Sequence, residues 1–357
     1  MRKRNAVRAV AAALAAMMAL TACGGGGGNE TTAAAGGDTG STAAGGDAAA
    51  SGSGEVGKTD ITFAMGADIV TLDPAGQQDT TTSVIIKHVY STLLDISDEG
   101  ELVPDLAESY ELVNDTDFVF KLREDAVWSD GTPVTANDVK FTFDRAKNMP
   151  KTKSNTSKVK EVVVDNEHQV TIKLTEPYAP FKSIVANSNL SIVQEAAVTA
   201  AGEAYGDADN AVGSGPFTVK EWVPNDHYTL EKNANYWGEE PITTSITCRV
   251  IPEGSARAIA LETGEVDLVW NVDPTDCSNI EANSDVKLLS QPSSSIEYLG
   301  MNVTKEHFKD QKVRQAINYA IDKQALVDTI VEGRGTVANS YINNTDRKST
   351  RLNSSHI

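Results

Sequence analysis

The clearest hydrophobic pattern of the chain lies between residues 106 and 146. Apolar side chains at every second position predict a strand with one buried face, and they are Phe118, Phe120 and Leu122, alternating with Val119, Lys121 and Arg123. A turn follows at Asp130-Gly131 and Pro133. The period then changes from two to that of a helix.

This helix is predicted to start at Thr135, with Asp138 three residues later as its capping partner. Its apolar face consists of Val139, Phe143 and Ala146. The combination of strand, turn and capped helix is common among α/β proteins and, by itself, indicates no more than that class.

Shorter patterns predict the remaining elements of the first half. We expect a strand at 61–64, a helix at 81–94 and a β-hairpin made of 159–164 and 169–174 around a polar turn.

In the second half, strands and helices alternate, which favours an α/β lobe with a largely parallel sheet. The predicted strands are 217–222, 246–251, 266–270, 286–290 and 295–302, and the helices between them are 255–263 and 275–282. Two more helices follow. The first has an apolar face of Val313, Ala316, Ile317 and Ala320, and the second is capped by Asp322, bears Leu326 and Ile330, and ends at Gly333.

The first 22 residues are typical of a targeting segment. Four basic residues (Arg2, Lys3, Arg4, Arg8) precede an apolar core at 9–20 that is too short for a membrane span. Leu20-Thr21-Ala22-Cys23 resembles a lipobox, in which the Cys23 thiol accepts a diacylglyceryl group. The alternative is an ordinary secretory peptide with a chance cysteine. We predict export and lipid anchoring through Cys23, followed by a flexible glycine- and alanine-rich tether that spans roughly 30 Å.

Composition narrows the classes of function. The chain has 357 residues, 40% of them hydrophobic, which is enough for two packed lobes. A net charge of -19 argues against nucleic acid as a partner. Three cysteines form no disulfide framework. Cys248 and Cys277 would either pair in an oxidising compartment or remain two buried thiols, and we favour the thiols.

No pattern of catalytic residues is evident. The five histidines are scattered without metal-ligand spacing, and neither a G-x-S-x-G elbow nor a helix-opening GxGxxG occurs. The glycine cluster before residue 217 precedes a strand and not a helix, which argues against a phosphate site. A chance pair of carboxylates, as in a glycosidase, stays open as an alternative. We predict no enzyme, no cofactor and no metal site.

Several short motifs together resemble the family 5 extracytoplasmic solute-binding proteins, the receptors of peptide and nickel ABC importers. Besides the 106–146 stretch, they are Leu72-Asp73-Pro74, the 102–107 segment LVPDLA, the 213–217 segment GSGPF, Tyr236-Trp237-Gly238, the 298–302 segment YLGMN and the 313–322 segment VRQAINYAID. The resemblance covers about 61–342.

The resemblance implies an α/β, two-lobed periplasmic-binding-protein-like fold (class II) with an extra domain in lobe I. The implied division is a signal peptide at 1–22, a tether at 23–55, the lobe I core at 56–75 and 200–294, the extra domain at 76–199, the start of lobe II at 295–345 and a tail at 346–357. The tail DRKSTRLNSSHI lacks apolar periodicity and resembles translated adapter DNA. We therefore interpret the second lobe as truncated and the tail as artefactual.

The same resemblance implies capture of a small solute by closure of two lobes, and its delivery to a membrane permease driven by an ATPase. Di- and oligopeptides are the preferred ligands. Nickel chelates, oligosaccharides and opines are alternatives, and a cell-surface hydrolase is a more distant one. The receptor is expected to be a monomer at the outer face of the cytoplasmic membrane or in the periplasm.

Three patches are implied to touch the ligand. They are Gln78, Asp79 and Thr80 after the LDP turn; Trp270 and Asn271 at a strand end; and Ser294 with Tyr298 near the crossover. Trp270 would stack on a side chain or sugar, and Asn271 would hydrogen-bond a peptide backbone. The alternative is that Trp270 and Tyr298 belong to the core.

Overall fold

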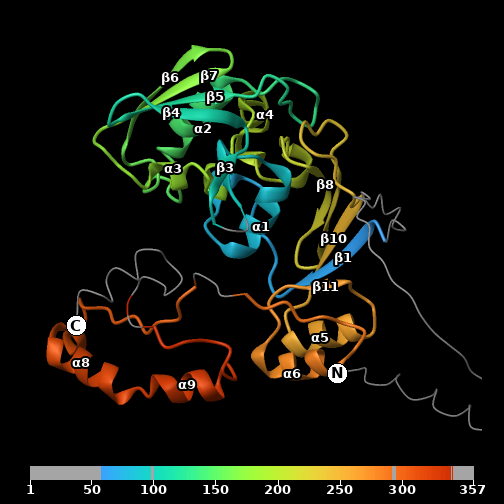
Figure 1. The fold of residues 1–357 in the computed structure, drawn as a ribbon, viewed down its shortest axis with the longest axis vertical. Coiled ribbons are helices and arrows are strands. Elements are labelled where there is room, and N and C mark those ends of the chain that lie inside the picture. The colour runs from blue at the N-terminus through green and yellow to red at the C-terminus, as the bar shows by residue number, and fades with distance from the viewer. Residues whose placement is uncertain (1–57, 98–99, 292–294, 339, 341–357) are drawn as a thin grey trace, which may run out of the picture. The chain divides into compact units, whose positions relative to one another are not determined.

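The computed structural model describes residues 58–97, 100–291, 295–338 and 340, and Cys23, Ser294 and the tail lie outside this part of the chain. Two sheets of four or more strands organise it (Figure 1). The five-stranded sheet has the order β11-β1-β10-β9-β8. Its strands are β1 (Asp60–Met65), β8 (Phe217–Val223), β9 (His227–Lys232), β10 (Ser245–Val250) and β11 (Leu268–Val269).

This sheet is mixed, so the prediction of a largely parallel sheet is wrong. β1 pairs in parallel with both β10 and β11, whereas β10–β9 and β9–β8 pair antiparallel. The difference comes from β9, which was not among the predicted strands. Its Tyr228 and Leu230 are buried on one face, and the tight turn from β8 places Asn225 at a φ of 62°.

Helix α1 (Thr80–Val89) packs its apolar face on this sheet. Ile85, Ile86 and Val89 belong to the same buried cluster as Phe63, Met65 and Leu230. The helix is shorter than the predicted 81–94, because Tyr90 is extended and its N–H closes the last turn on the Ile86 carbonyl. Leu93 and Leu94 fit the helical period but lie in a different core.

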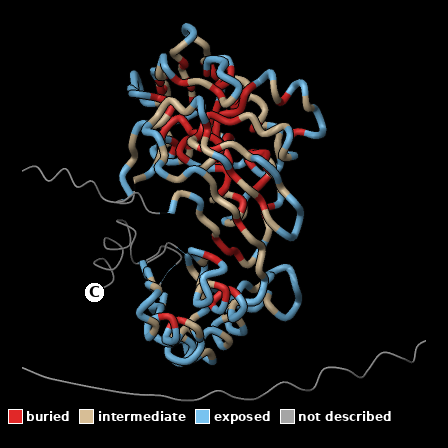
Figure 2. The backbone as a smooth tube through the Cα atoms, turned by 90° about the vertical axis from the view of Figure 1, so that its right-hand side faces the viewer, coloured by how far each residue is buried: buried red, intermediate tan, exposed pale blue. Residues whose placement is uncertain are grey.

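That second core lies under the antiparallel sheet β4-β5-β7-β6. Its strands are β4 (Ala107–Leu112), β5 (Asp117–Leu122), β6 (Val159–Asn166) and β7 (Gln169–Leu174), and α2 (Ala136–Ala146) packs on it. Phe118, Phe120 and Leu122 are buried, as predicted, and so are Val139 and Phe143 of α2. Figure 2 colours the buried positions of both cores red.

The remaining elements are short. They are β2 (Leu94–Ile96), β3 (Leu102–Pro104), α3 (Phe181–Ile184), α4 (Glu195–Ala201), α5 (Gly254–Glu262), α6 (Pro274–Ala282), α7 (Glu306–Lys309), α8 (Gln311–Ala320), α9 (Lys323–Thr329) and the 3-10 turns η1 (Pro74–Gly76), η2 (Ser188–Leu190), η3 (Gly202–Ala204) and η4 (Ala208–Asn210). The predicted hairpin and the helices near 255, 275 and 313–330 are confirmed.

Two predicted strands do not form. Residues 286–290 and 295–302 carry no regular secondary structure, and Leu289 is 75% exposed. An apolar run becomes a strand only where a sheet edge accepts its backbone, and neither segment has such a neighbour in the described part.

Both described cysteines, Cys248 and Cys277, are buried and free, which confirms the thiol interpretation. Among the described residues, no helix is long and apolar enough to cross a membrane.

Candidate functional site

The LDP turn is fixed by a buried ion pair. Asp73 is only 5% exposed, and its two carboxylate oxygens accept bonds of 2.8 and 2.7 Å from Nη1 and Nη2 of Arg145, at the end of α2. Asp73 also accepts the N–H of Ala75 at 3.1 Å, which shapes the 3-10 turn η1. This two-pronged geometry is the strongest form of carboxylate recognition, and it ties the loop after β1 to a helix residue 72 positions away.

Two tyrosines cover this ion pair. The ring centroid of Tyr205 lies 5.3 Å from the Arg145 guanidinium carbon. Tyr90 belongs to the same buried cluster, and burial raises the pKa of both hydroxyls above the ordinary tyrosine value. The base of the loop is thus rigid and neutral overall.

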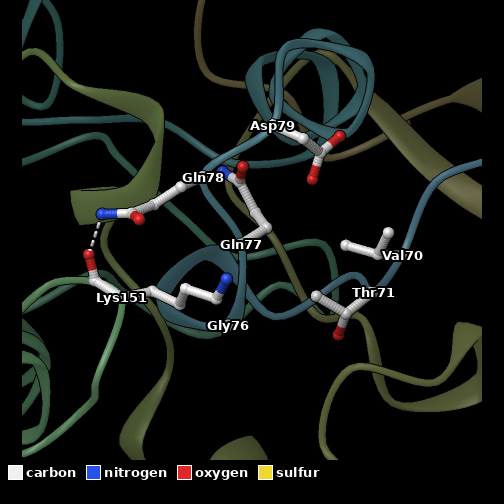
Figure 3. A pocket seen from close by; sticks show the side chains of 7 residues that line it. All are labelled: Val70, Thr71, Gly76, Gln77, Gln78, Asp79 and Lys151. Atoms are coloured by element: carbon white, nitrogen blue, oxygen red, sulfur yellow. Dashed lines mark hydrogen bonds between the residues drawn. The ribbon is translucent and has the colours of Figure 1, made fainter. Parts of the chain in front are cut away.

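The loop that leaves this anchor lines a pocket of about 600 Å³ (Figure 3). Its lining residues are Val70, Thr71, Gly76, Gln77, Gln78, Asp79 and Lys151. The Gln78 side-chain amide donates to the backbone carbonyl of Lys151, which joins the loop to the segment after α2. Asp79 accepts the N–H of Thr82 at 2.8 Å and so caps α1.

A second pocket of about 430 Å³ shares three residues with the first. It is lined by Gln77, Gln78, Asp79, Thr80, Ser83, Asn155, Asn187 and Asn189. This lining, as far as the described residues form it, consists of amides and hydroxyls with a single carboxylate and no basic side chain. Gln78, Asp79 and Thr80, which are consecutive in the chain, thus line one polar pocket together with the three asparagines, and their contact with a ligand stays a prediction.

Sequence reasoning missed the partners of this patch. Asn155, Asn187 and Asn189 lie between 70 and 110 residues further along the chain, and no motif singles them out. Gln77 directly precedes the predicted residues, and no pattern in the sequence marks it as part of the site. A buried amide cannot be distinguished from an exposed one by residue type alone.

The predicted Trp270 and Asn271 lie at the end of β11. The Trp270 N–H donates to the Ala64 carbonyl at 3.0 Å, and its side chain is 37% exposed. Asn271 has a φ of 58° and its carbonyl accepts Nη2 of Arg257 at 3.2 Å. This is the carboxyl edge of three parallel-paired strands, the usual location of ligands in open α/β sheets.

Neither predicted aromatic residue belongs to the core, since Tyr298 is 70% exposed and Trp270 is partly exposed. Trp270 is not among the residues that line the two pockets described above. Ser294 lies outside the described residues. Within the described ranges, no group of three or more histidine, cysteine or acidic side chains is placed to hold a metal ion.

Residues 101–355 match the family described as bacterial extracellular solute-binding proteins, family 5 Middle. The chain belongs to this family. Membership confirms the resemblance inferred from the motifs, and it agrees with the prediction of a binding protein and not an enzyme. The family is described as extracellular, in line with the predicted location outside the cytoplasm.

The chain is 32% identical over 288 residues to the glutathione-binding protein GsiB of Escherichia coli (strain K12), covering 79% of this chain and 56% of GsiB. It therefore spans about half the length of this family 5 relative.

Solved family 5 structures confirm the predicted α/β fold of two-lobed periplasmic binding proteins. NikZ from Campylobacter jejuni in complex with Ni(L-His) is 25% identical, with a TM-score of 0.73 over 82% of this chain and 59% of NikZ. The periplasmic binding protein DppA from Helicobacter pylori in complex with the peptide STSA is 26% identical, with a TM-score of 0.70 over 77% of this chain and 58% of DppA.

Proposed function

We propose that this family 5 chain is the solute-binding receptor of an ABC importer and that it captures di- or oligopeptides. The observation that carries this proposal is the polar pocket pair at Gln77–Asp79, formed on the rigid Asp73–Arg145 anchor. The names of two relatives support it, because GsiB is a glutathione-binding protein and DppA was solved with a peptide.

In this proposal, residues 56–75 and 200–294 form the core of lobe I, residues 76–199 its extra domain, and residues 295–345 the beginning of lobe II. Closure of the lobes over the solute is favoured only by contacts made in the closed state. Trp270 and Asn271 at the strand edge, Ser294 and Tyr298 would supply the side chains on which the solute closes. The closed receptor would then deliver its solute to a permease and ATPase.

A nickel chelate is the second candidate ligand, favoured by the similarity to NikZ with Ni(L-His). A chelate carries its own metal ligands, so it would be held by polar and aromatic contacts alone. Both ligands fit a receptor without a resident metal.

The experiment is a thermal-shift and fluorescence titration with a panel of di- to pentapeptides and with nickel–histidine. We expect peptides to raise the melting temperature and to change Trp270 emission, and Trp270→Ala to weaken binding by roughly 1–3 kcal/mol. Trp222→Phe is the control for emission, since the Trp222 indole N–H donates to Asp68 at 3.2 Å. A response to nickel–histidine alone would mean that the ligand is a chelate and not a peptide. Unchanged affinity in folded Trp270→Ala would mean that Trp270 does not belong to the binding site.

A further inference from the structure

Arg257, on helix α5, is a buried arginine whose partners are mostly backbone carbonyls. Its side chain is 6% exposed. Nη1 donates to the carbonyls of Ile251 and Pro252 at 2.9 and 2.8 Å, and Nη2 donates to the carbonyl of Asn271 at 3.2 Å. The Asp273 carboxylate lies 3.6 Å from Nη2. A buried charge is stable only where polar groups replace its water, and here three carbonyls supply most of that replacement.

The guanidinium contacts the chain just beyond three strands of the five-stranded sheet. Ile251 and Pro252 follow β10, Asn271 follows β11, and β1 lies between these two strands. The residue after β1 is Gly66, where a Cβ atom would lie 2.9 Å from Nη1. A glycine at this position therefore leaves room for the guanidinium. One side chain thus links the carboxyl ends of three strands, next to α5 and β11 (Figure 1).

The turn after β11 has a backbone conformation that its own sequence disfavours. Asn271 has a φ of 58°, in the left-handed region that is costly for a residue with a Cβ atom. Such a conformation persists only where the surrounding structure determines it. The Trp270 N–H is bound to the Ala64 carbonyl on one side of the turn, and Arg257 holds the Asn271 carbonyl on the other. The two bonds together fix the direction in which Trp270 leaves the sheet.

A simple link between α5 and α6 would not require this arrangement. Asp273 is 53% exposed and its contact with Arg257 is the longest of the four, so it contributes little by itself. The carbonyl bonds act on the strand ends instead. They hold a turn whose Trp270 side chain is 37% exposed, at the edge of the sheet where open α/β folds bind ligands.

We propose that Arg257 is a positioning residue of the receptor, which holds the turn at Trp270 and Asn271 so that the Trp270 ring is in place before the solute arrives. A side chain that is already ordered saves the entropy cost of ordering it on binding. This inference rests on the proposed contact between Trp270 and the solute. It assigns no solute contact to Arg257 itself.

Fluorine NMR of the full chain labelled with 5-fluorotryptophan tests the proposal, because the chain has four tryptophans and Trp270→Phe identifies the resonance of Trp270. Arg257→Met keeps an apolar stem and removes the donors. We expect it to move the Trp270 resonance toward that of free 5-fluorotryptophan and to leave the other three unchanged. In a titration with trialanine, its dissociation constant should rise by about fivefold or more.

The matched control is Arg249→Met on β10. Arg249 lies 3.3 Å from Glu265, and the two side chains are 43% and 62% exposed. This variant should change neither the four resonances nor the dissociation constant. Arg257→Lys keeps the charge but lacks the planar fork that reaches several carbonyls, so we expect it to recover only part of the affinity.

Gly66→Ala gives a second test that keeps the arginine, in case Arg257→Met does not fold. The added methyl group would lie 2.9 Å from Nη1 and should displace the guanidinium. The Trp270 resonance should then move in the same direction as in Arg257→Met, by a smaller amount. An unchanged Trp270 resonance in folded Gly66→Ala would overturn the proposal.

Three further outcomes separate the possible roles. A lower melting temperature of Arg257→Met with all four resonances unchanged would show a purely structural arginine and overturn the proposal. A moved Trp270 resonance with unchanged affinity for trialanine would overturn the link to binding while capture of peptides stands. If the natural chain does not respond to millimolar trialanine, the proposed capture of peptides is contradicted, whereas the resonance alone still decides whether Arg257 holds Trp270.

Discussion

Arg145 and Asp73 show how one residue pair holds two distant parts of the chain. The side chains of Arg145 and Asp73 are 20% and 8% exposed, so the ion pair has little contact with solvent. Such a pair adds little net stability compared with an apolar contact, but loss of one partner leaves a buried charge. At this place the Asp73–Arg145 pair fixes the position of the loop that carries Gln77 and Gln78.

We expect Arg145→Ala to lower the free energy of unfolding by about 3–5 kcal/mol, because Asp73 keeps a buried carboxylate without a partner. The double variant Asp73→Asn, Arg145→Met should recover part of this loss. Urea unfolding measures both. Lys87→Ala is the control, since its pair with Asp95 is 46% and 45% exposed and should be worth less than about 1 kcal/mol. Equal losses of unfolding free energy in Arg145→Ala and Lys87→Ala would contradict the role assigned to the burial of the Asp73–Arg145 pair.

Asp105, in the LVPDLA segment, links stability to pH. Burial raises the pKa of its carboxyl to about 6, although it accepts the Thr92 N–H at 2.6 Å. Between the unfolded pKa of 3.8 and the folded value, the unfolded chain loses this proton and the folded chain retains it. Stability from this group is therefore present below pH 4 and falls as pH rises to 6.

Asp105→Asn should remove that fall, so the variant should gain about 1–3 kcal/mol over the natural chain at pH 7 and nothing at pH 4. Urea titrations at pH 4, 5, 6 and 7 measure the difference. Asp285→Asn, at an exposed position, serves as the control. A constant difference across these pH values would contradict the assigned pKa.

At the scale of elements, helices with a full apolar face and strands of period two were predictable. The α2 stripe, the β5 alternation and the β6–β7 hairpin formed because local pattern and burial agree. The 286–290 and 295–302 strands failed because a strand depends on a neighbouring backbone, which its own sequence does not specify. β9 was missed although Tyr228 and Leu230 alternate, since a two-residue signal is too short to stand out.

Only the part of the candidate site that a motif marks could be predicted from the sequence. Gln78, Asp79 and Thr80 follow the LDP turn directly and all three line the 430 Å³ pocket, and their contact with a solute stays a prediction. Asn155 and Asn189 reach the same pocket through tertiary packing. Gln77 is buried, and its Nε2 has no hydrogen-bond partner among the described residues. Residue type reveals neither of these facts.

Helices α8 and α9 carry apolar side chains that the described residues do not cover. Tyr319 is 87%, Leu326 51% and Val313 39% exposed, and neither helix contains a buried residue. Short helices without tertiary packing are marginal in water. An exposed apolar face of this kind is also an association hazard.

We expect amide hydrogens of Gln311–Ala320 and Lys323–Thr329 to exchange within seconds, whereas those of β5 and β7 are protected for hours. Hydrogen exchange with mass spectrometry on the 357-residue chain measures both regions in one experiment. We also expect this chain to bind peptides weakly. Strong protection of both helices together with micromolar binding would contradict this prediction.

At the scale of the whole molecule, we propose that the receptor is held at the membrane through Cys23, at the start of a low-complexity tether that lies outside the described residues. Cys23→Ala should abolish incorporation of a labelled fatty acid and release the protein or leave its leader attached. Cys248→Ala is the control, since it removes a buried thiol and should leave the labelling unchanged. Labelling that persists in Cys23→Ala would refute the anchor.

β1 lies between β11 and β10 in the five-stranded sheet, and both of these partners are synthesised much later than β1. Its partner β10 follows about 180 residues later, as the Asp60–Ser245 bond spans 185 positions. At about 5–20 residues per second, a ribosome leaves β1 without its neighbour for roughly 10–40 s. The antiparallel sheet, contained within residues 107–174, is complete long before that. The nascent chain therefore contains a complete antiparallel sheet while the five-stranded sheet is still incomplete. During that interval the unpaired apolar strand β1 is accessible to chaperones.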